Sequence, residues 1–324
     1  MLLSAIVSGR AEAAARTFVA SDGLDANTAF NCSLAKPCRG FSAAQTVTDN
    51  SGEIIVLDSA GYGAVTITKS ISIIAPSGVY AGIAVFPGLD GVSIATPGIS
   101  VVLRGLTING QGGDQGINMI DGAKLTVENC LISNLNQNGI VVTAPAIVRV
   151  TDTTIRDNGF DGIRLQSGAR GTVTRTMIRG HNIGYGIYVA SDVPGSITTG
   201  DIANTTIDGN ANGIFASSLN ATAVVKVSLR DGRIVGNSGL GVVADSSAGA
   251  AVTISASNNI VSNNGIGISA FSTGTKLWAS GNTVSDNTAA GWLNQGALFE
   301  SAGNNAVRNN LLDISGAITP IATQ

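Results

Sequence analysis

The stretch LISNLNQNGIVVTAPAIVRVTDTTIRDNGFDGIRLQSGARGTVTRTMIRGHNIGYGI, residues 131–187, repeats one phrase three times. An aliphatic residue is followed by Asn, and a few residues later by Gly and a second aliphatic residue. The first copy places these at Ile132, Asn134, Gly139 and Ile140. The glycines of the whole series lie at positions 116, 139, 162, 186, 213, 241, 267 and 291, so the copies are 23 to 28 residues apart. A period in this range is typical of stacked repeat architectures.

Each repeat is built from short runs of alternating aliphatic and polar residues, such as 146–150 and 252–254, separated by Gly, Asn, Asp and Ser. Such alternation bounded by turn residues indicates short strands. Leucine-rich repeats have a similar period but need a dense leucine pattern and a helix in each repeat, and leucine is scarce here. We therefore predict an all-β protein, a right-handed parallel β-helix. Roughly ten or eleven coils at about 4.8 Å per coil give a rod of about 50 Å.

The recurring Asn and Gly have structural roles in this prediction. Asn adopts the left-handed conformation readily and bonds to nearby backbone, and stacked Asn side chains can bond to one another in ladders. We expect such a turn ladder rather than a ligand site. Gly allows a tight bend or a close backbone approach. The expected ladder residues are Asn134, Asn158, Asn182, Asn210, Asn237, Asn263, Asn287 and Asn310.

The chain divides into three segments. Residues 1–15 contain an apolar run and end in small residues at Ala13 and Ala15, which resembles a signal peptide cleaved after Ala15, although the usual basic start is missing. Residues 16–50 are predicted to be a loop followed by a short capping helix at 41–47. Residues 51–324 form the β-helix, and the stretch 311–320 is expected to close its C-terminal end, because an open solenoid end exposes core and strand edges.

Composition limits the possible partners. The net charge is -3 and only 12% of the residues are charged, without a basic patch, so we expect no nucleic-acid partner. Aromatic residues make up 4%, which argues against a broad aromatic-lined cleft. No stretch after the N-terminal run is long and apolar enough to span a membrane.

Three cysteines are present. Cys32 and Cys38 lie six residues apart in a loop with a proline, and they are expected to form a disulfide in an oxidising compartment. The alternative is two free thiols in a cytosolic protein. Cys130 aligns with Thr153 and Thr176 in the next repeats and is expected to face inward as a small buried residue.

The N-terminal sequence resembles a known family. Thr17-Phe18-Val19, then Pro37-Cys38-Arg39-Gly40-Phe41, then GEIIVLDSAGYGAVTITKSISIIAP at 52–76, look like bacterial right-handed β-helix proteins of the pectin lyase-like superfamily. With the repeats, the resemblance covers nearly the whole chain after residue 15. It implies the fold strongly and a secreted, periplasmic or cell-surface location. It implies function weakly, because the superfamily includes lyases, hydrolases, esterases, epimerases and non-catalytic surface proteins.

The motifs of the superfamily's enzymes are missing. The hydrolase-type Asn-Thr-Asp, Asp-Asp, Gly-His-Gly and Arg-Ile-Lys motifs do not occur, nor does the epimerase-type Asp-Pro-His-Asp. The single histidine, His181, has no following Gly and no Gly-x-Ser-x-Gly elbow to accompany it. Calcium-dependent lyases need clustered Asp ligands, whereas the acids here are scattered singly. We therefore expect no metal and no cofactor, with calcium as an alternative that no motif supports.

One band, residues 149–188, concentrates Arg, Asp and Tyr. The repeat places Arg156 beside Arg179, Asp161 near Tyr185 and Arg164 beside Tyr188. Arg can pair with sugar carboxylates and Tyr can contact sugar faces. The alternative reading of the band is a salt-bridged, solvated flank. The predicted ligand-binding residues, expected on one flank of the rod, are Arg156, Asp161, Arg164, Arg179, Tyr185 and Tyr188.

The sequence thus predicts a secreted or surface β-helix scaffold without catalytic activity that binds a polysaccharide or cell-surface glycan through this band. A polysaccharide lyase or related enzyme acting on an acidic glycan is the first alternative. Its weak catalytic candidates are Asp157, Asp161, Arg164 and Arg179. The second alternative is a structural rod that associates end to end.

Overall fold

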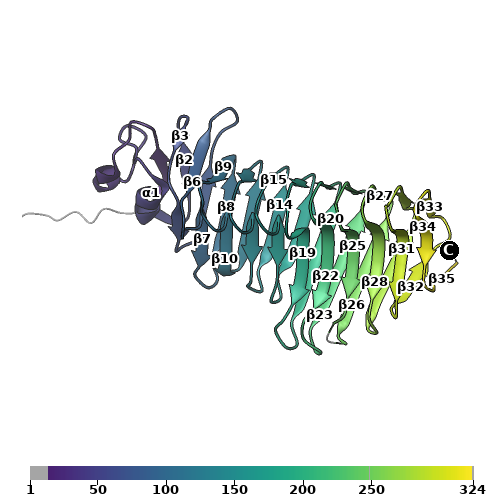
Figure 1. Cartoon of the computed structure of the whole chain (residues 1–324). Helices are drawn as coiled ribbons and strands as arrows, with labels where there is room; N and C mark the ends of the chain where they lie inside the picture. The colour runs from purple at the N-terminus through teal and green to yellow at the C-terminus, as the bar shows by residue number, and fades with distance from the viewer. Residues whose placement is uncertain (1–13, 248, 323–324) are drawn as a thin grey trace, which may run out of the picture.

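The chain folds into a rod of stacked coils, shown from purple to yellow along its length in Figure 1. The computed structural model describes residues 14–247 and 249–322. Each coil contributes one strand to each of three parallel sheets, which we name sheets A, B and C. Two of the sheets have 11 strands and one has 13, so the expected parallel β-helix of ten or eleven coils is confirmed.

Sheet A is the widest of the three. In spatial order it consists of β1 (Ala14–Val19), β2 (Thr48–Val56), β5 (Ile71–Ile74), β8 (Ser100–Arg104), β11 (Lys124–Glu128), β14 (Ile147–Thr151), β17 (Arg170–Thr174), β20 (Ile197–Ala203), β23 (Val224–Arg230), β26 (Ala251–Ser257), β29 (Thr275–Ser280), β32 (Leu298–Ser301) and β35 (Thr319–Pro320).

Sheet B follows sheet A in each coil after a short turn. It consists of β3 (Ala60–Gly61), β6 (Ala81–Val85), β9 (Leu106–Gly110), β12 (Leu131–Ser133), β15 (Thr154–Arg156), β18 (Met177–Arg179), β21 (Thr206–Asp208), β24 (Arg233–Val235), β27 (Ile260–Ser262), β30 (Thr283–Ser285) and β33 (Ala306–Arg308).

Sheet C completes each coil. It consists of β4 (Val65–Ile67), β7 (Val92–Ala95), β10 (Ile117–Asp121), β13 (Ile140–Val142), β16 (Ile163–Leu165), β19 (Tyr185–Ser191), β22 (Asn212–Ser218), β25 (Leu240–Asp245), β28 (Ile266–Phe271), β31 (Ala290–Gln295) and β34 (Leu312–Ser315).

The repeat phrase supplies the core. The two aliphatic residues of each copy point inward from sheets B and C and stack on their equivalents in the next coil, as Ile155 does on Ile178 and Ile163 on Ile187. The repeat glycine is needed because of close packing between coils. A Cβ on Gly162 would lie 2.5 Å from Ile178 Cγ2 and 2.6 Å from a backbone oxygen of the next coil. The close approach expected of these glycines is confirmed.

The N-terminal end of the rod is covered by α1 (Phe41–Val47), the expected capping helix. Its side chains Phe41 and Ala44 are fully buried on the first coil, and the Phe41 ring lies 5.3 Å from that of Tyr62. The short 3-10 helix η1 (Asp25–Phe30) and the loop after it lie beside α1 at this end (Figure 1). The chain before α1 also forms β1, which joins sheet A and was not expected from the sequence.

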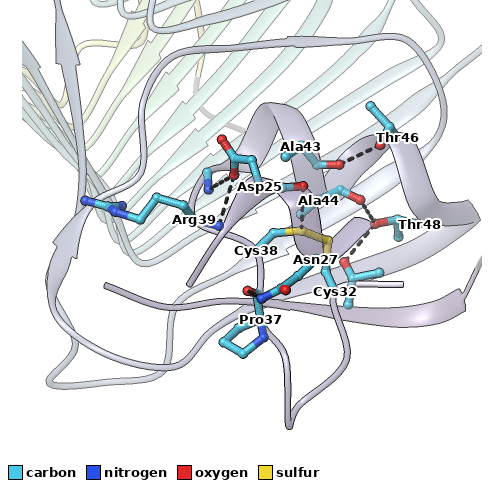
Figure 2. The surroundings of a disulfide bond; sticks show 12 residues. Asp25, Asn27, Cys32, Pro37, Cys38, Arg39, Ala43, Ala44, Thr46 and Thr48 are labelled. Carbon is cyan, nitrogen blue, oxygen red and sulfur yellow. Dashed lines mark hydrogen bonds between the residues drawn. A yellow bond between two sulfur atoms is a disulfide. The ribbon is translucent and has the colours of Figure 1, made fainter. Parts of the chain in front are cut away.

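The disulfide between Cys32 and Cys38 is present, with a Cα–Cα distance of 4.9 Å (Figure 2). It closes the loop that follows η1, where Asp25 Oδ1 accepts hydrogen bonds from the backbone N–H groups of Arg39 and Gly40. Cys130 is buried and its N–H bonds to Thr153 Oγ1, so its expected inward position is also confirmed.

Two expectations concern the ends of the chain. Residues 1–13 of the expected signal peptide lie outside the described residues, whereas Ala14 and Ala15 begin β1. At the other end, the stretch expected to form a cap provides β34 and β35, which extend sheets C and A. Leu311, Leu312 and Ile314 there are more than half exposed. Among the described residues, no helix is long and apolar enough to cross a membrane.

The Asn ladder exists, but its register differs from the prediction at three positions. The buried column between sheets B and C contains Asn158, His181, Asn210, Asn237, Asn264, Asn287 and Asn310. Asn134 and Asn263 were assigned to it wrongly. Both have positive φ and lie one residue earlier, at the left-handed bend. Asn182 is exposed, because His181 takes its place.

A second buried column lies between sheets A and B. It begins with Cys130, Thr153 and Thr176 and ends with Asn259, Asn282 and Asn305. Each of its Asn side chains accepts a hydrogen bond from the N–H of the equivalent residue one coil earlier, as Asn282 Oδ1 does from Asn259. The two columns satisfy backbone groups at tight turns where water has no access.

Replacing Asn237 by Ala is expected to lower the free energy of unfolding by roughly 2–4 kcal/mol, because buried partners on both sides lose a bond. Asn237 Oδ1 accepts from Asn210, and its Nδ2 donates to Asn264. The matched control is Asn182→Ala, expected to change stability by less than about 0.5 kcal/mol. Urea denaturation of both variants measures the difference, and equal effects would contradict the assigned register.

Candidate functional site

The six residues of the predicted binding band separate into two groups. Arg156 and Arg179 are neighbours in β15 and β18 of sheet B, as expected. Arg164 and Tyr188 are neighbours in β16 and β19 of sheet C, also as expected. The turn 157–162 bends the chain from one sheet to the other, so the prediction that all six residues share one flank is wrong.

Arg156 and Arg179 do not form a binding site with the others. Arg156 makes an ion pair with Asp157, which sits at the left-handed bend with φ 56°. Arg179 is exposed and lies next to Asp208 of β21 in the strand register, without an ion pair between them. These residues form the solvated, charged flank that was the alternative reading of the band.

The other four residues come together on sheet C. Arg164 Nη1 lies 3.1 Å from Asp161 Oδ2, and Arg164 Nε donates to Gln166 Oε1 at 2.9 Å. The guanidinium also lies over the Tyr188 ring, 4.5 Å from its centroid, a cation–π arrangement. Arg164 is therefore fixed by three neighbours at once, while its side chain remains 31% exposed.

Asp161 is buried and belongs to a third column of stacked polar residues. The residues directly before successive repeat glycines are Asp90, Gln115, Asn138 and Asp161, and each accepts a hydrogen bond from the N–H of its counterpart one coil later. Burial raises the pKa of the Asp161 carboxyl, while the Tyr185 N–H and Arg164 oppose that rise. A side-chain acceptor before each of these four glycines is a sequence signal that predicts this column, and our sequence reasoning missed it.

The column is interrupted at Tyr185, which occupies the same position but has an aromatic side chain, and it resumes at Asn212, whose Oδ1 accepts from the Leu240 N–H. Its ring stacks on Phe215 with a centroid distance of 4.9 Å and an interplanar angle of 11°. Tyr188 joins both rings at 5.6 and 5.7 Å. Phe215 was also missed, although it follows Gly213 and Ile214 just as Tyr188 follows its own Gly-Ile pair.

The three rings hide one another's faces and expose their edges. Tyr188 is only 7% exposed, because Arg164, Tyr185 and Phe215 surround it. Neither tyrosine hydroxyl has a hydrogen-bond partner among the described residues, and neither is sealed from solvent. Burial raises the pKa of both phenols, so both are neutral donors at ordinary pH.

These side chains line a hollow of about 250 Å³. Besides the residues already described, its wall includes Gly184 and two exposed apolar side chains, Phe160 at 45% and Ile183 at 67% exposure. We call this hollow the Arg164 site. It is lined by Phe160, Asp161, Arg164, Ile183, Gly184, Tyr185, Tyr188 and Phe215.

The Arg164 site lacks the features of acid–base catalysis. The two phenols have raised pKa values, so neither is a ready base, and the Arg164 guanidinium is engaged in an ion pair with Asp161. The Asp161 carboxylate is occupied by a backbone N–H and by Arg164. Within the described part of the chain, no group of three or more His, Cys, Asp or Glu residues is arranged to hold a metal ion.

His181 stands behind the site, in the Asn column. It is fully buried, its Nδ1 accepts from the Asn158 N–H at 3.3 Å, and its Nε2 has no partner among the described residues. Burial lowers the pKa of His181 to about 4. It is therefore a neutral structural residue and not a catalytic one. Asn158 Nδ2 also has no partner among the described residues, whereas its Oδ1 accepts from the Leu135 N–H.

Comparison with known proteins confirms the fold family. The family model described as "Right handed beta helix region" matches residues 90–253, which is 164 of the 324 residues and just over half of the chain. The chain therefore belongs to the right-handed β-helix family, as its resemblance to pectin lyase-like proteins predicted. The search of curated proteins found no match to this chain.

Solved structures agree with this assignment. Pectate lyase Pel9A is 18% identical with a TM-score of 0.64, and the match covers 91% of this chain and 79% of that one. XylC in complex with xylose is 10% identical with a TM-score of 0.53, covering 86% and 69%. The polygalacturonase of Erwinia carotovora ssp. carotovora is 12% identical with a TM-score of 0.52, covering 91% and 97%. At identities this low, the structural similarity shows a shared fold and nothing more.

Replacing His181 by Asn is expected to stabilise the protein and to remove a pH dependence. The folded-state pKa of about 4 lies below the unfolded value near 6.5, so the unfolded chain binds the extra proton first. The wild type should lose roughly 2 kcal/mol of stability to His181 between pH 7 and pH 4.5. Urea denaturation of both proteins at the two pH values isolates the contribution of His181 to the free energy of unfolding, because the two proteins have all other titratable groups in common. An unchanged pH dependence in His181→Asn would show that the histidine is not held neutral.

Proposed function

We propose that this protein is an extracellular β-helix scaffold that binds a glycan at the Arg164 site without cleaving it. The observation that carries the proposal is the combination of two unpartnered tyrosine hydroxyls, a fixed guanidinium and apolar walls around one small hollow. Sugars present the same combination of hydroxyl groups and apolar ring faces, and sites that bind them supply a few oriented polar groups on an apolar surface.

The rigidity of the site supports binding. Arg164, Tyr185, Tyr188 and Phe215 are anchored in three adjacent strands of sheet C. Arg164 is held by Asp161, Gln166 and Tyr188 before any ligand arrives. A side chain that is already ordered loses little conformational entropy when it binds. The hollow is small, so a single sugar ring would occupy it while the rest of the glycan lay along the rod.

Two further points support the location and the lack of catalysis. The Cys32–Cys38 disulfide fits an oxidising compartment outside the cytoplasm. The polysaccharide lyase alternative requires a general base at the site. Asp161 and Arg164 are already hydrogen-bonded, to each other and, for Asp161, to the Tyr185 N–H, so neither is free to take that role. The similar structures named for pectate lyase and polygalacturonase make carbohydrate a reasonable ligand class to test first.

The structural-rod alternative has one observation in its favour. Leu311 and Ile314 in the last described coil are 75% and 51% exposed, and apolar side chains at a solenoid end promote association. Light scattering over a range of protein concentrations tests this role separately from glycan binding.

The double variant Arg164→Gln/Tyr185→Phe is expected to weaken glycan binding by about tenfold or more, because it removes a charged donor and a hydroxyl from the hollow. Affinity electrophoresis in gels that contain neutral or uronate polysaccharides measures the retention, and an assay for reducing ends and unsaturated products runs beside it.

The matched control is Arg156→Gln/Arg179→Gln, which removes two arginines from sheet B and should leave retention unchanged. Thermal unfolding shows whether each variant is folded. Product formation by the wild type would contradict the non-catalytic proposal, and equal losses in both double variants would contradict the placement of the site.

A further inference from the structure

We propose that the Arg164 site selects uncharged sugars and rejects uronates, an inference that rests on the proposed glycan-binding function. The presence of an arginine among tyrosines first suggests an acidic ligand, since arginine commonly pairs with carboxylates. The contacts of Arg164 and the charges around it point the other way.

The positive charge of Arg164 is already neutralised by a carboxylate of the protein. Its ion pair with Asp161 is internal, and the Asp161 side chain is 3% exposed, so that counter-ion cannot turn away into solvent. Side-on pairing with a carboxylate needs Nε together with a terminal nitrogen. Nε already donates to Gln166, and Nη1 already donates to Asp161. Nη2 keeps both of its N–H groups and Nη1 keeps one, and these remaining donors suit sugar hydroxyls, whereas the side-on approach of a carboxylate is closed because Nε is taken.

The wider surroundings are acidic. The charge of Asp245, at the end of β25, raises the pKa of Tyr185, and the charge of Asp192, directly after β19, raises the pKa of Tyr188. Both tyrosines owe their raised pKa first to burial, and these carboxylates add to the rise. Asp192 accepts a bond from Ser167 and Asp245 from Ser272, and neither forms an ion pair within the described residues.

The charged side chains that shift the pKa values of the two tyrosines are therefore the Arg164 guanidinium and three carboxylates, those of Asp161, Asp192 and Asp245. A uronate bound in the hollow would add a fourth carboxylate and find no unpaired cation. A neutral ring adds no charge and can bond to the Tyr185 and Tyr188 hydroxyls and to Arg164 Nη2. Its apolar face can rest on Phe160 and Ile183, both of which line the hollow.

The test uses pairs of trisaccharides that differ only at C6, with a hydroxymethyl group in one and a carboxylate in the other: galactose with galacturonate, glucose with glucuronate, and mannose with mannuronate. Isothermal titration of the purified protein at low salt gives each dissociation constant. We expect the neutral member of any pair that binds to bind at least about tenfold more tightly, given the acidic surroundings.

The variant Asp192→Asn/Asp245→Asn should reduce that ratio by removing two of the repelling charges. The control Asp201→Asn removes a carboxylate from sheet A and should leave the ratio unchanged. Because a variant can fail to fold, the wild type is also titrated at rising salt, where screening should narrow the same ratio.

The outcomes separate the two proposals. Uronates that bind as tightly as their neutral partners, or more tightly, overturn the selectivity and leave glycan binding standing. A neutral preference that responds neither to the double variant nor to salt overturns its electrostatic origin. If no member of any pair binds, both the selectivity and the proposed function are overturned.

Discussion

Hydrogen bonding between successive coils is the constraint on which the rest of this structure depends. A coil of about 23 residues has three turns, and the backbone groups at those turns are buried between neighbouring coils where water cannot reach them. Side chains in three columns satisfy such groups at two of the turns, one column between sheets A and B and two between sheets B and C, and each side chain bonds to the coil before or after it. An insertion inside one of these turns would move the column residue out of line with its partner in the next coil. Differences in length between coils are therefore confined to the segments between the columns.

This constraint explains where the Arg164 site lies. The acceptor column that runs through Asn138 and Asp161 is interrupted where Tyr185 replaces the next acceptor. Asp161 still bonds to the Tyr185 N–H, so the stack continues, but the Tyr185 side chain is free to turn outward and stack on Phe215. The aromatic cluster is thus a local exception within a regular scaffold, and local exceptions are where function is expected.

The same buried network gives Asp161 two roles. As a column member it fixes the backbone of the next coil, and as a partner of Arg164 it holds the guanidinium over Tyr188. Its carboxylate is consequently unavailable to a substrate. Asp161, one of the catalytic candidates of the sequence analysis, thus has its carboxylate engaged by the scaffold itself, which supports the proposal of a rigid binding surface.

The sequence by itself determined the period, the parallel coils, the inward aliphatic columns, the capping helix at 41–47, the Cys32–Cys38 pair and the neighbour relations of Arg156 with Arg179 and of Arg164 with Tyr188. All of these follow from spacing, because equal steps along a solenoid place residues side by side. Only the tertiary structure decided that these two pairs lie on different sheets, that His181 replaces Asn182 in the column, and that Phe215 joins the tyrosines. The reason is that spacing fixes position along the rod axis. Position around the axis depends on the left-handed bends at residues such as Asn134 and Asp157, and a one-residue difference there turns a side chain from the core to the solvent.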